Sequence, residues 1–456
     1  MAHKKTTKHE SRKTTREVTR DEGPYQSPKG MRDLIGEEAY AFQGFMEKAA
    51  EVAIYYGFTP IETPVLEYEE VFVRGVGEAT DVVSKELYSL RTKGGDRLAL
   101  RPEFTANIMR AYIEHGMGNL PQPVMLYSFG NLYRHDKPQK GRYREFRSFG
   151  VEILGSDKSI NDVITIKVFL DIMEEAGLTN LTLKLNSIGD KDCRPNYRRE
   201  LVNYYKKHLG KICPDCVERF KTNPMRLLDC KEEKCQPIKI GAPDSISYLC
   251  EQCKHHFKEV LEYLEALKIE YTIDNTLVRG LDYYTRTVFE VAQVIESEGN
   301  RTESLALGGG GRYDYLAKNL GSNKPVPAVG FGMGVDRIVE LTGKNGLTPR
   351  VLKRPKVFFI QLGIEAKLKS LSIIEVLRKA RIPVAHSVSK DSIGSQLSAA
   401  EKLKIPYCLI LGQREVLDDT VIVRDMETRS QKSVKLVDLP HYIKELALPS
   451  SRLAKK

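Results

Sequence analysis

The sequence lacks tryptophan and any long apolar run. None of the 456 residues is Trp, only 8% are aromatic, and no stretch approaches the roughly 18 consecutive apolar residues of a membrane-spanning helix. The first twenty residues contain no apolar stretch of the kind found in secretory signals. We therefore expect a soluble protein of the cytoplasm, with no membrane partner.

Length and charge predict an enzyme of two or three domains with a basic C-terminal part. Apolar residues make up 41% and charged residues 29% of the chain, whose net charge is +10. Residues 350–456 hold 21 Lys and Arg against 11 Asp and Glu, whereas residues 1–349 balance at 50 against 50. A basic terminal domain suits a polyanion such as RNA, although a solvated lysine-rich surface explains the same charge.

Residues 1–25 read as a disordered basic tail, because large apolar residues are nearly absent. A domain over 26–345 shows helical spacing of apolar residues in some segments and strand-like alternation in others, which predicts an α+β core with a mixed, mainly antiparallel sheet. The expected helices are 37–58, 103–115 and 160–176; the expected strands are 59–67, 96–101, 124–130, 146–154, 181–186, 271–275 and 287–295.

Two further segments differ in texture from this core. Residues 190–270 are charged, helical and rich in cysteine, and we interpret them as an insertion. Residues 355–446 alternate strand and helix patterns, which is typical of a small α/β domain with a mainly parallel sheet. A short basic tail, 447–456, ends the chain.

Three motifs combine arginine with glycine or tyrosine. In VRGLDYYTRTVFEV, 278–291, Arg279 precedes Gly280, which leaves room for a phosphate to approach the guanidinium. Arg134 and Arg142 lie in the arginine-rich hairpin 133–152, and Arg337 follows the glycine run of GFGMGVDRI. The structural alternatives are an exposed charged hairpin, a surface ion pair and helix-packing glycines.

These segments, taken in order with GFTPIETPVLE, LRPEFTANIMR and ALGGGGRYD, closely resemble histidyl-tRNA synthetase, a class II synthetase. The resemblance spans residues 28 to about 445. It implies a ligase that activates L-histidine with ATP to histidyl-adenylate and pyrophosphate, and then transfers histidine to the 3′ end of tRNA(His). It also implies a homodimer, with the block 57–67 at the interface.

The resemblance assigns catalysis to three arginines. Arg134 and Arg279 match the residues that hold the α-phosphate and the histidine carboxylate, Arg337 matches the arginine along the outer phosphates, and Arg142 belongs to the ATP site. Positioned cations stabilise negative charge that builds at phosphorus in the transition state. Mg²⁺ is expected on the β- and γ-phosphates, since ATP usually carries it.

The same resemblance supplies a histidine pocket. Glu103 and Thr105 match contacts to the amino group, Glu152 and Tyr284 match contacts to the imidazole, and Tyr283 lines the pocket. One position departs from the family pattern: Ser148 stands where most members have glutamine. The shorter side chain loses an amide donor, so we expect Ser148 only to line the site.

Six cysteines at 213–253 predict a structural zinc site. Cys213-Pro-Asp-Cys216 and Cys250-Glu-Gln-Cys253 are two CxxC pairs separated by 33 residues, a pattern typical of four-thiolate zinc. Cys230 and Cys235 compete as ligands, so the choice of four stays open. Free thiols in a reducing compartment are the alternative.

The segment from 355 resembles the anticodon-binding domain of several class II synthetases, which would give the basic charge its target. Two other functions fit parts of the sequence. One is the noncatalytic relative that regulates an ATP phosphoribosyltransferase, although that relative usually lacks the C-terminal domain and the full arginine set. The other is an RNA-binding zinc protein without catalysis.

Overall fold

The computed structural model describes residues 25–137, 141–297, 301–343, 347–350, 354–387, 389 and 391–446. The tails predicted at 1–25 and 447–456 fall outside this range apart from Tyr25. The chain divides into two compact units, Met1–Pro349 and Arg350–Lys456, and each is described by itself.

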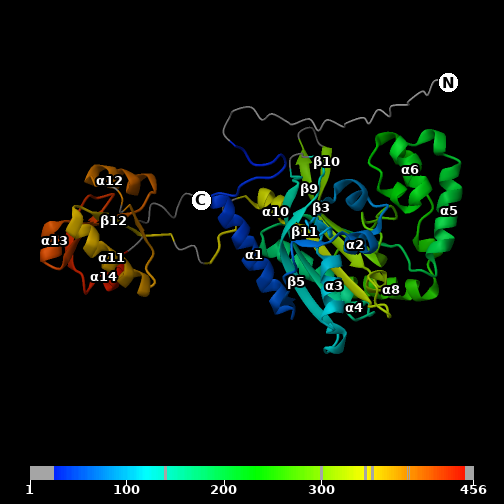
Figure 1. Cartoon of the computed structure of the whole chain (residues 1–456), viewed down its shortest axis with the longest axis horizontal. Helices are drawn as coiled ribbons and strands as arrows, with labels where there is room; N and C mark the ends of the chain where they lie inside the picture. The colour runs from blue at the N-terminus through cyan, green and yellow to red at the C-terminus, as the bar shows by residue number, and fades with distance from the viewer. Residues whose placement is uncertain are drawn as a thin grey trace, which may run out of the picture. The chain divides into compact units, whose positions relative to one another are not determined.

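An eight-stranded sheet forms the centre of the first unit (Figure 1). Its order is β1-β5-β6-β11-β10-β9-β7-β8. The edge pairs β1–β5 and β7–β8 are parallel and the other five pairs are antiparallel, as expected for a mixed, mainly antiparallel sheet. The strands are β1 (Thr59–Pro60), β5 (Val124–Tyr133), β6 (Glu145–Leu154), β7 (Leu181–Ser187), β8 (Thr272–Ile273), β9 (Thr285–Ser297), β10 (Arg301–Arg312) and β11 (Ala328–Gly334).

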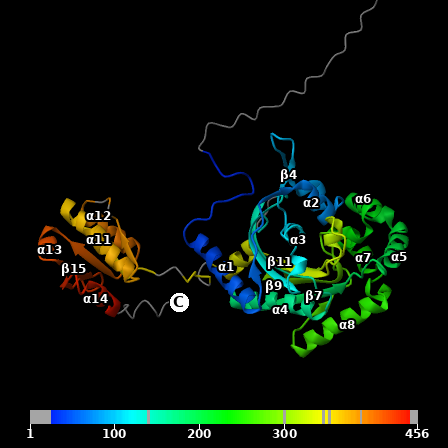
Figure 2. The same cartoon turned by 60° about the horizontal axis from the view of Figure 1, so that its bottom comes forward.

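The two faces of this sheet differ in side-chain size. On β6, Phe149, Val151 and Ile153 belong to the core that also contains residues of α1 (Glu37–Tyr55), α4 (Ile160–Glu175) and α8 (Glu251–Ala266). Figure 2 shows α1 and α4 along one side of the curved sheet and α3 (Thr105–Glu114) on the other. Successive strand residues point to opposite faces. The even-numbered residues of β6, which include Ser148, Gly150 and Glu152, therefore face the α3 side.

The remaining helices of this unit are short. They are α2 (Glu69–Phe72), α5 (Arg194–Lys206), α6 (Pro214–Thr222), α7 (Gln236–Ile240), α9 (Leu316–Asn319) and α10 (Val335–Thr342). Seven single turns complete the helical segments: Val73–Gly77, Val82–Glu86, Met117–Asn119, Leu209–Lys211, Pro224–Asp229, Glu233–Cys235 and Ile246–Tyr248. Among the described residues, the length and hydropathy needed to cross a membrane do not occur together in any helix.

The segment expected as one strand over 59–67 is divided in the structure. Its first two residues form β1, and its end enters β2 (Leu66–Tyr68) of a separate antiparallel sheet with β4 (Arg97–Leu100) and β3 (Tyr88–Arg91). Pro60 and Pro64 have no N–H for a continuous ladder, which explains the interruption. The single-strand prediction was wrong on this point.

Residues 190–270 separate into two parts. Helices α5, α6 and α7 lie together (Figure 2) and share a small core of their own, which includes Tyr197, Leu201 and Tyr205. Helix α8 instead packs on α4, and its Phe257 and Val260 belong to the main core. Only the first part of the segment is thus a separate lobe.

The second unit is a five-stranded sheet in the order β13-β12-β14-β15-β16 with helices on both faces. Its elements are β12 (Val357–Gln361), α11 (Ile364–Lys379), β13 (Val384–His386), α12 (Ile393–Lys402), β14 (Tyr407–Leu411), α13 (Gln413–Leu417), β15 (Thr420–Asp425), β16 (Gln431–Lys435) and α14 (Leu439–Glu445). The α/β prediction holds, but the expectation of a mainly parallel sheet was wrong. Strands β15 and β16 pair antiparallel because only a short turn joins them.

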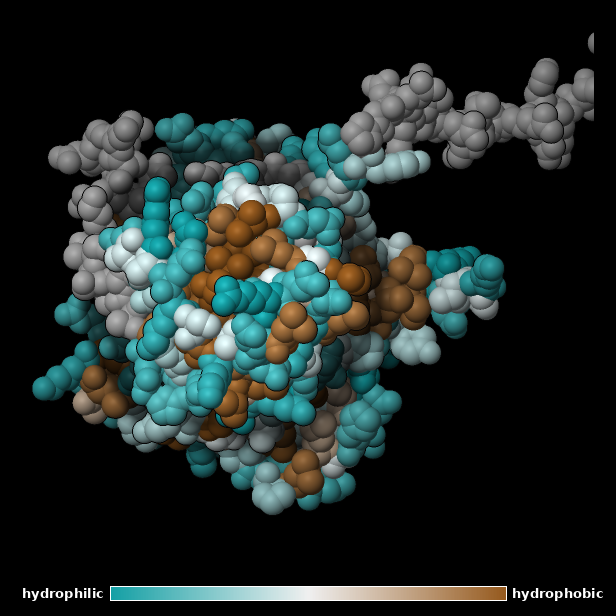
Figure 3. Space-filling view, turned by 90° about the vertical axis from the view of Figure 1, so that its left-hand side faces the viewer, coloured by the Kyte–Doolittle hydropathy of each residue, from teal (hydrophilic) through white to brown (hydrophobic). Residues whose placement is uncertain are grey.

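One face of the second unit mixes apolar and hydrophilic side chains (Figure 3). Ile364, Leu368 and Leu371 of α11 are spaced at helical intervals and exposed, and Leu417 at the end of α13 is exposed too. The surface of this unit is therefore not uniformly basic, although the sequence gives it a surplus of positive charge.

A buried ion network joins three elements of the first unit. Arg312, at the end of β10, is fully buried; its Nη1 lies 2.5 Å from Asp162 Oδ2 on α4, and its Nε lies 3.2 Å from Asp314 Oδ1. His256 of α8 reaches the other oxygen of Asp162 at 3.1 Å. The charge of Arg312, and after it the hydrogen bond from His256, hold the pKa of Asp162 below its ordinary value against the opposing effect of burial.

Asp162→Asn should destabilise the protein by about 3 kcal/mol or more, because it leaves the Arg312 guanidinium buried with a single carboxylate. The matched control is Asp157→Asn, in an exposed pair with Lys158, which should change the free energy of unfolding by less than about 0.5 kcal/mol. Unfolding is best followed by circular dichroism, since the chain has no tryptophan. Equal stabilities for the two variants would contradict this role of the network.

Candidate active site

All ten residues predicted for the histidine and ATP sites line one cavity of about 650 Å³ on the α3 side of the sheet. They come from the start of α3, from β5–β6 and its loop, from the segment before β9, and from α10. The residues are Glu103, Thr105, Arg134, Arg142, Ser148, Glu152, Arg279, Tyr283, Tyr284 and Arg337. Positions up to 234 residues apart in the sequence thus meet in one place.

Glycines on β10 and β11 leave this cavity open. Gly330, Gly332 and Gly334 pair with Glu152, Gly150 and Ser148 of β6, so they are strand residues and not helix-packing glycines. A Cβ at Gly330 would lie 1.6 Å from Glu152 Oε2, and a Cβ at Gly309 would lie 3.1 Å from Arg279 Cζ. Glycine is required at Gly330 because any side chain there would displace the carboxylate.

Glu152 is buried at the floor of the cavity and held by two hydroxyls. Thr105 Oγ1 donates to its Oε1 at 2.6 Å, and the Tyr313 hydroxyl donates to its Oε2. Burial raises the pKa of Glu152 to about 8, against the opposing effect of these hydrogen bonds. Near neutral pH the carboxyl can therefore hold a proton and exchange it with an imidazole ring bound beside it.

Glu103 has a structural task as well as a place in the site. Its carboxylate accepts the backbone N–H groups of Thr105 and Ala106 at 2.7 and 2.8 Å, which caps the start of α3. The Tyr283 hydroxyl lies 3.4 Å away. Burial raises the pKa of Glu103 despite these donors. A bound ammonium would find a preoriented acceptor here.

Two of the predicted arginines present guanidinium groups to the cavity. Arg279 Nη1 donates to Glu290 Oε2 of β9 at 2.9 Å, while its Nε has no hydrogen-bond partner among the described residues. Arg134 Nε donates to the Pro102 carbonyl at 3.0 Å, and its guanidinium lies 5.5 Å from the Phe146 ring centre. Both side chains are anchored at one edge, and Arg279 has a buried donor available for a ligand.

Arg337 and Arg142 form a second cationic corner. Arg337 Nε and Nη1 donate to the carbonyls of Gly141 and Ala306 at 3.0 and 2.8 Å. Burial, and then the nearby charge of Arg142, lower the pKa of Arg337. Arg142 is itself paired with Asp136 at 3.0 Å. Cations that repel each other in a concave site favour an anionic ligand.

Ser148 does line the cavity, as predicted, and its hydroxyl is already engaged. Its Oγ donates to the Met333 carbonyl at 3.0 Å. This hydrogen bond joins β6 to β11, so the serine holds the wall of the cavity together.

Sequence reasoning missed several residues of the site. Tyr313 lay inside a quoted motif, but its contact with Glu152 depends on the sheet geometry. Asp81 lines the cavity and receives Arg219 and Arg226 of the inserted lobe, each at 3.0 Å. No local sequence motif predicts the contacts of Asp81, because they join segments that are distant in the sequence.

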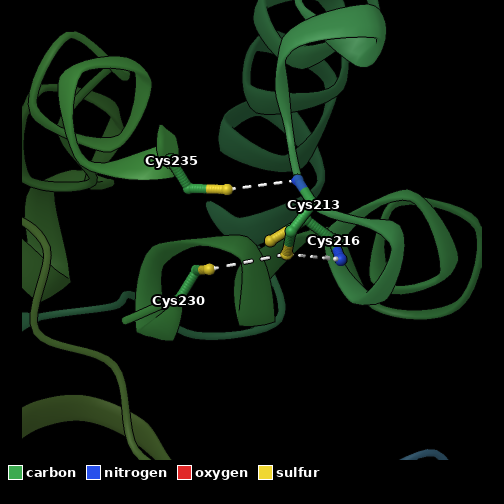
Figure 4. Close-up of side chains that lie close together, drawn as sticks. All are labelled: Cys213, Cys216, Cys230 and Cys235. Atoms are coloured by element: carbon green, nitrogen blue, oxygen red, sulfur yellow. Dashed lines mark hydrogen bonds between the residues drawn. The ribbon is translucent and has the colours of Figure 1, made fainter. Parts of the chain in front are cut away.

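The cysteines are grouped differently from the prediction. The two CxxC pairs do not share one site: Cys213 and Cys216 meet Cys230 and Cys235, as Figure 4 shows. Cys250 and Cys253 lie in a second group with Asp190 and Cys193, a cysteine that the prediction left out. The proposed set Cys213, Cys216, Cys250 and Cys253 is therefore wrong, because α6 and α8 belong to different cores.

A mainly antiparallel sheet that carries paired arginines, carboxylates and a glycine-lined cavity, with a separate α/β unit after it, defines a class II aminoacyl-tRNA synthetase. Residues 30–189 and 245–338 match the family described as Histidyl-tRNA synthetase, and residues 356–446 match the Anticodon binding domain. The unmatched stretch between the first two segments contains α5, α6 and α7.

Curated relatives and a solved structure give the same result. Histidine–tRNA ligases of Dehalococcoides mccartyi and Natranaerobius thermophilus are each 41% identical, covering 92% of this chain and 99% of theirs. The structure of apo histidyl-tRNA synthetase from S. aureus matches with a TM-score of 0.76 and 28% identity, over 92% of this chain and 100% of that one. This chain belongs to the histidyl-tRNA synthetase family.

The raised pKa of Glu152 predicts a pH-dependent cost. Between its ordinary pKa of 4.5 and its folded value of about 8, only the folded state keeps the proton, so stability falls as pH rises and levels off above about 8. Relative to Glu152→Gln, the free energy of unfolding of the wild type should fall by a few kcal/mol across this range, with a slope of about 1.4 kcal/mol per pH unit. Denaturant unfolding at several pH values tests this, with the exposed Glu174→Gln as control; parallel wild-type and Glu152→Gln curves would refute it.

Gly330→Ala should lower the melting temperature of the ligand-free protein, whereas Gly332→Ala should not. The first Cβ would fall 1.6 Å from Glu152 Oε2, and the second would have only Ser148 Oγ near it, at 3.8 Å. Both positions share a strand and a face, so helix or strand propensity cannot separate them. The measurement is the melting temperature of each variant. An equal decrease for Gly330→Ala and Gly332→Ala would contradict the steric argument.

Proposed function

We propose that this chain joins L-histidine to tRNA(His) in two steps. A histidine carboxylate oxygen attacks the α-phosphorus of ATP, the bond to the β-phosphate oxygen breaks, and pyrophosphate leaves. The histidyl group then passes from the adenylate to the 3′-terminal ribose of the tRNA, and AMP is released. The observation that carries the proposal is the convergence of all ten predicted residues on one cavity.

The charged groups of the cavity divide the work between two ends. Arg279 and Arg134 stabilise the negative charge that grows at the α-phosphate, and they orient the carboxylate for attack. Arg337 and Arg142 hold the outer phosphates of ATP, which arrives with Mg²⁺. The unpartnered Nε of Arg279 and the lowered pKa of Arg337 both support anion binding.

Histidine is selected by the carboxyl groups at the other end. Glu152 accepts from or donates to one ring nitrogen, because its pKa of about 8 lets it exist in either form. Tyr284 contacts the ring beside it, Glu103 and Thr105 receive the ammonium, and Tyr283 closes the side of the pocket. An analogue without that ring nitrogen would leave Glu152 with only its two hydroxyl partners, and the hydrogen bond to the ligand would be lost inside a buried site.

The same proposal includes the partners and compartment expected for this enzyme. The unit from Arg350 binds the anticodon region of the tRNA. The chain forms a homodimer through the segment around 57–67, next to which Tyr55, Leu66 and Tyr68 expose large apolar side chains. A cytoplasmic location suits the eight free cysteines of the chain.

A structural zinc at Cys213, Cys216, Cys230 and Cys235 completes the proposal. Four sulfurs at about 2.3 Å from a tetrahedral zinc lie about 3.8 Å apart, and Cys213 Sγ is 3.8 Å from Cys230 Sγ. The Cys213 N–H donates to Cys235 Sγ at 3.2 Å, so backbone as well as side-chain contacts join these cysteines. These residues fit the metal, which would hold together a lobe with a small core.

The function is tested by pyrophosphate exchange into ATP with each of the twenty amino acids. We expect exchange with histidine alone, and Arg279→Ala should reduce it by about 10²–10³-fold, as loss of a transition-state cation does. Arg199→Ala removes an exposed arginine of α5 and should leave the rate unchanged. Absence of exchange from folded protein would favour the regulatory or RNA-binding alternatives, and a fully active Arg279→Ala would remove that residue from the mechanism.

A further inference from the structure

Asp190, Cys193, Cys250 and Cys253 form a second ligand cluster, outside the active-site cavity. One ligand atom from each residue lies within 4.8 Å of those of the others. Asp190, Cys193 and Cys253 are buried, and Cys250 is half-buried. The cluster joins the turn between β7 and α5, which contains Asp190 and Cys193, to the start of α8, where Cys253 lies 60 residues after Cys193.

The two CxxC pairs have nearly the same backbone conformation. Cys213 occupies the N-cap position of α6 with φ −75° and ψ 160°, and Cys250 occupies that of α8 with φ −69° and ψ 163°; the Cys213 sulfur accepts the Cys216 N–H, whereas the Cys250 side chain makes no such hydrogen bond. In each pair the second cysteine lies in the first helical turn, so both sulfurs point to one side. A CxxC pair built for a metal in the first cluster is thus repeated, with nearly the same backbone, in the second.

In the second cluster, the distances from Cys193 to Cys253 and to Asp190 are those expected between ligands of a single metal ion. Cys193 Sγ lies 3.8 Å from Cys253 Sγ and 3.4 Å from Asp190 Oδ1. Around a tetrahedral zinc, two sulfurs lie about 3.8 Å apart, and a sulfur and a carboxylate oxygen lie about 3.6 Å apart. A disulfide would require sulfurs about 2.05 Å apart. The side chains are therefore spaced as zinc ligands and not as a cystine.

The surroundings can balance the charge of such a site. Three thiolates, one carboxylate and Zn²⁺ sum to a charge of −2. Arg286 Nη2 lies 3.5 Å from Asp190 Oδ2, on the oxygen that does not approach Cys193. The Asp190 N–H donates to Cys193 Sγ at 3.2 Å, as the Cys216 N–H does to Cys213 Sγ at 3.4 Å in the first cluster.

We infer that Asp190, Cys193, Cys250 and Cys253 bind a second zinc ion, so that the chain holds two. This metal would lie behind the histidine pocket. Arg194, which follows Cys193, donates to the Tyr284 carbonyl, and the Arg286 N–H donates to the Gly189 carbonyl at 2.8 Å. The zinc fastens α5 and α8 to the strand end that carries the tyrosine pair. The inference does not rest on the catalytic roles proposed above.

Metal counting on the full chain tests the inference without any variant. The wild-type protein is expressed in medium that contains zinc, purified and dialysed against metal-free buffer. Elemental mass spectrometry should then find two zinc ions per chain. A mercurial thiol reagent should release both in a chromogenic zinc assay. One zinc per chain in the wild type, or none at all, would overturn the inference that the chain holds two.

Variants separate the two clusters. Cys193→Ser and Cys253→Ser should each lose one zinc and keep the other, Cys213→Ser should do the same through the first cluster, and Cys213→Ser with Cys253→Ser should hold none. Cys408→Ser is the matched control, because Cys408 is a buried cysteine that belongs to neither cluster, and it should keep two. Loss of both ions in Cys408→Ser would overturn the assignment.

Cobalt distinguishes the ligand sets directly. Cobalt-loaded Cys213→Ser should show the tetrahedral visible bands of a three-thiolate site, with weaker sulfur-to-metal charge transfer than cobalt-loaded Cys253→Ser, which retains four thiolates. Identical spectra from the two variants would refute the Asp190 ligand. Should a variant fail to fold, the wild-type count of two against one still decides the existence of the site.

Discussion

The active site depends on a sheet face from which side chains are absent. Glycines of β10 and β11, among them Gly309, Gly332 and Gly334, form a large part of the cavity wall. A Cβ at Gly330 would lie 1.6 Å from Glu152 Oε2, and a Cβ at Gly309 would lie 3.1 Å from Arg279 Cζ. The charged side chains of the cavity lie around these glycines. The carboxylate on β6 and the guanidinium before β9 can approach the sheet only because the neighbouring strands contribute no side chains there.

The opposite face supplies the rigidity that glycine strands lack. Phe149, Val151 and Phe331 belong to one continuous core with α1, α4 and α8. Arg312, at the end of the glycine run, anchors β10 to Asp162. The next residue, Tyr313, donates its hydroxyl to Glu152. The buried ion network thus fixes the position of the tyrosine that holds the Glu152 carboxyl, so packing on one face of the sheet positions a buried group on the other.

Much of the first unit could be predicted from periodicity, because its long helices and strands such as β5, β6 and β9 have strong patterns. Two central strands, β10 and β11, were missed, because their runs of glycine interrupt the alternation of apolar and polar residues. The ten site residues could be named from motifs, but their contacts could not. Tyr313 meets Glu152 only through strand register, and β16 was missed because its polar residues alternate weakly on an exposed edge. The cysteine sets were wrong because spacing identifies a CxxC pair but does not say which pairs share a core. Cys193 stands alone in sequence and joins Cys253 only in space.

The inserted lobe helps to form the cavity and must therefore be held in place. Arg219 and Arg226 reach across to Asp81, and Asp215 and Lys231 line the cavity near the first cysteine cluster. Three short helices with a small core would hold such residues loosely, since small domains bury too little apolar surface to be rigid by packing alone. The two zinc ions that we propose would cross-link the lobe at two points. The first would tie the lobe to itself, and the second would tie its first helix to α8 and to the strand end beneath the tyrosines, which would constrain the lobe relative to the cavity.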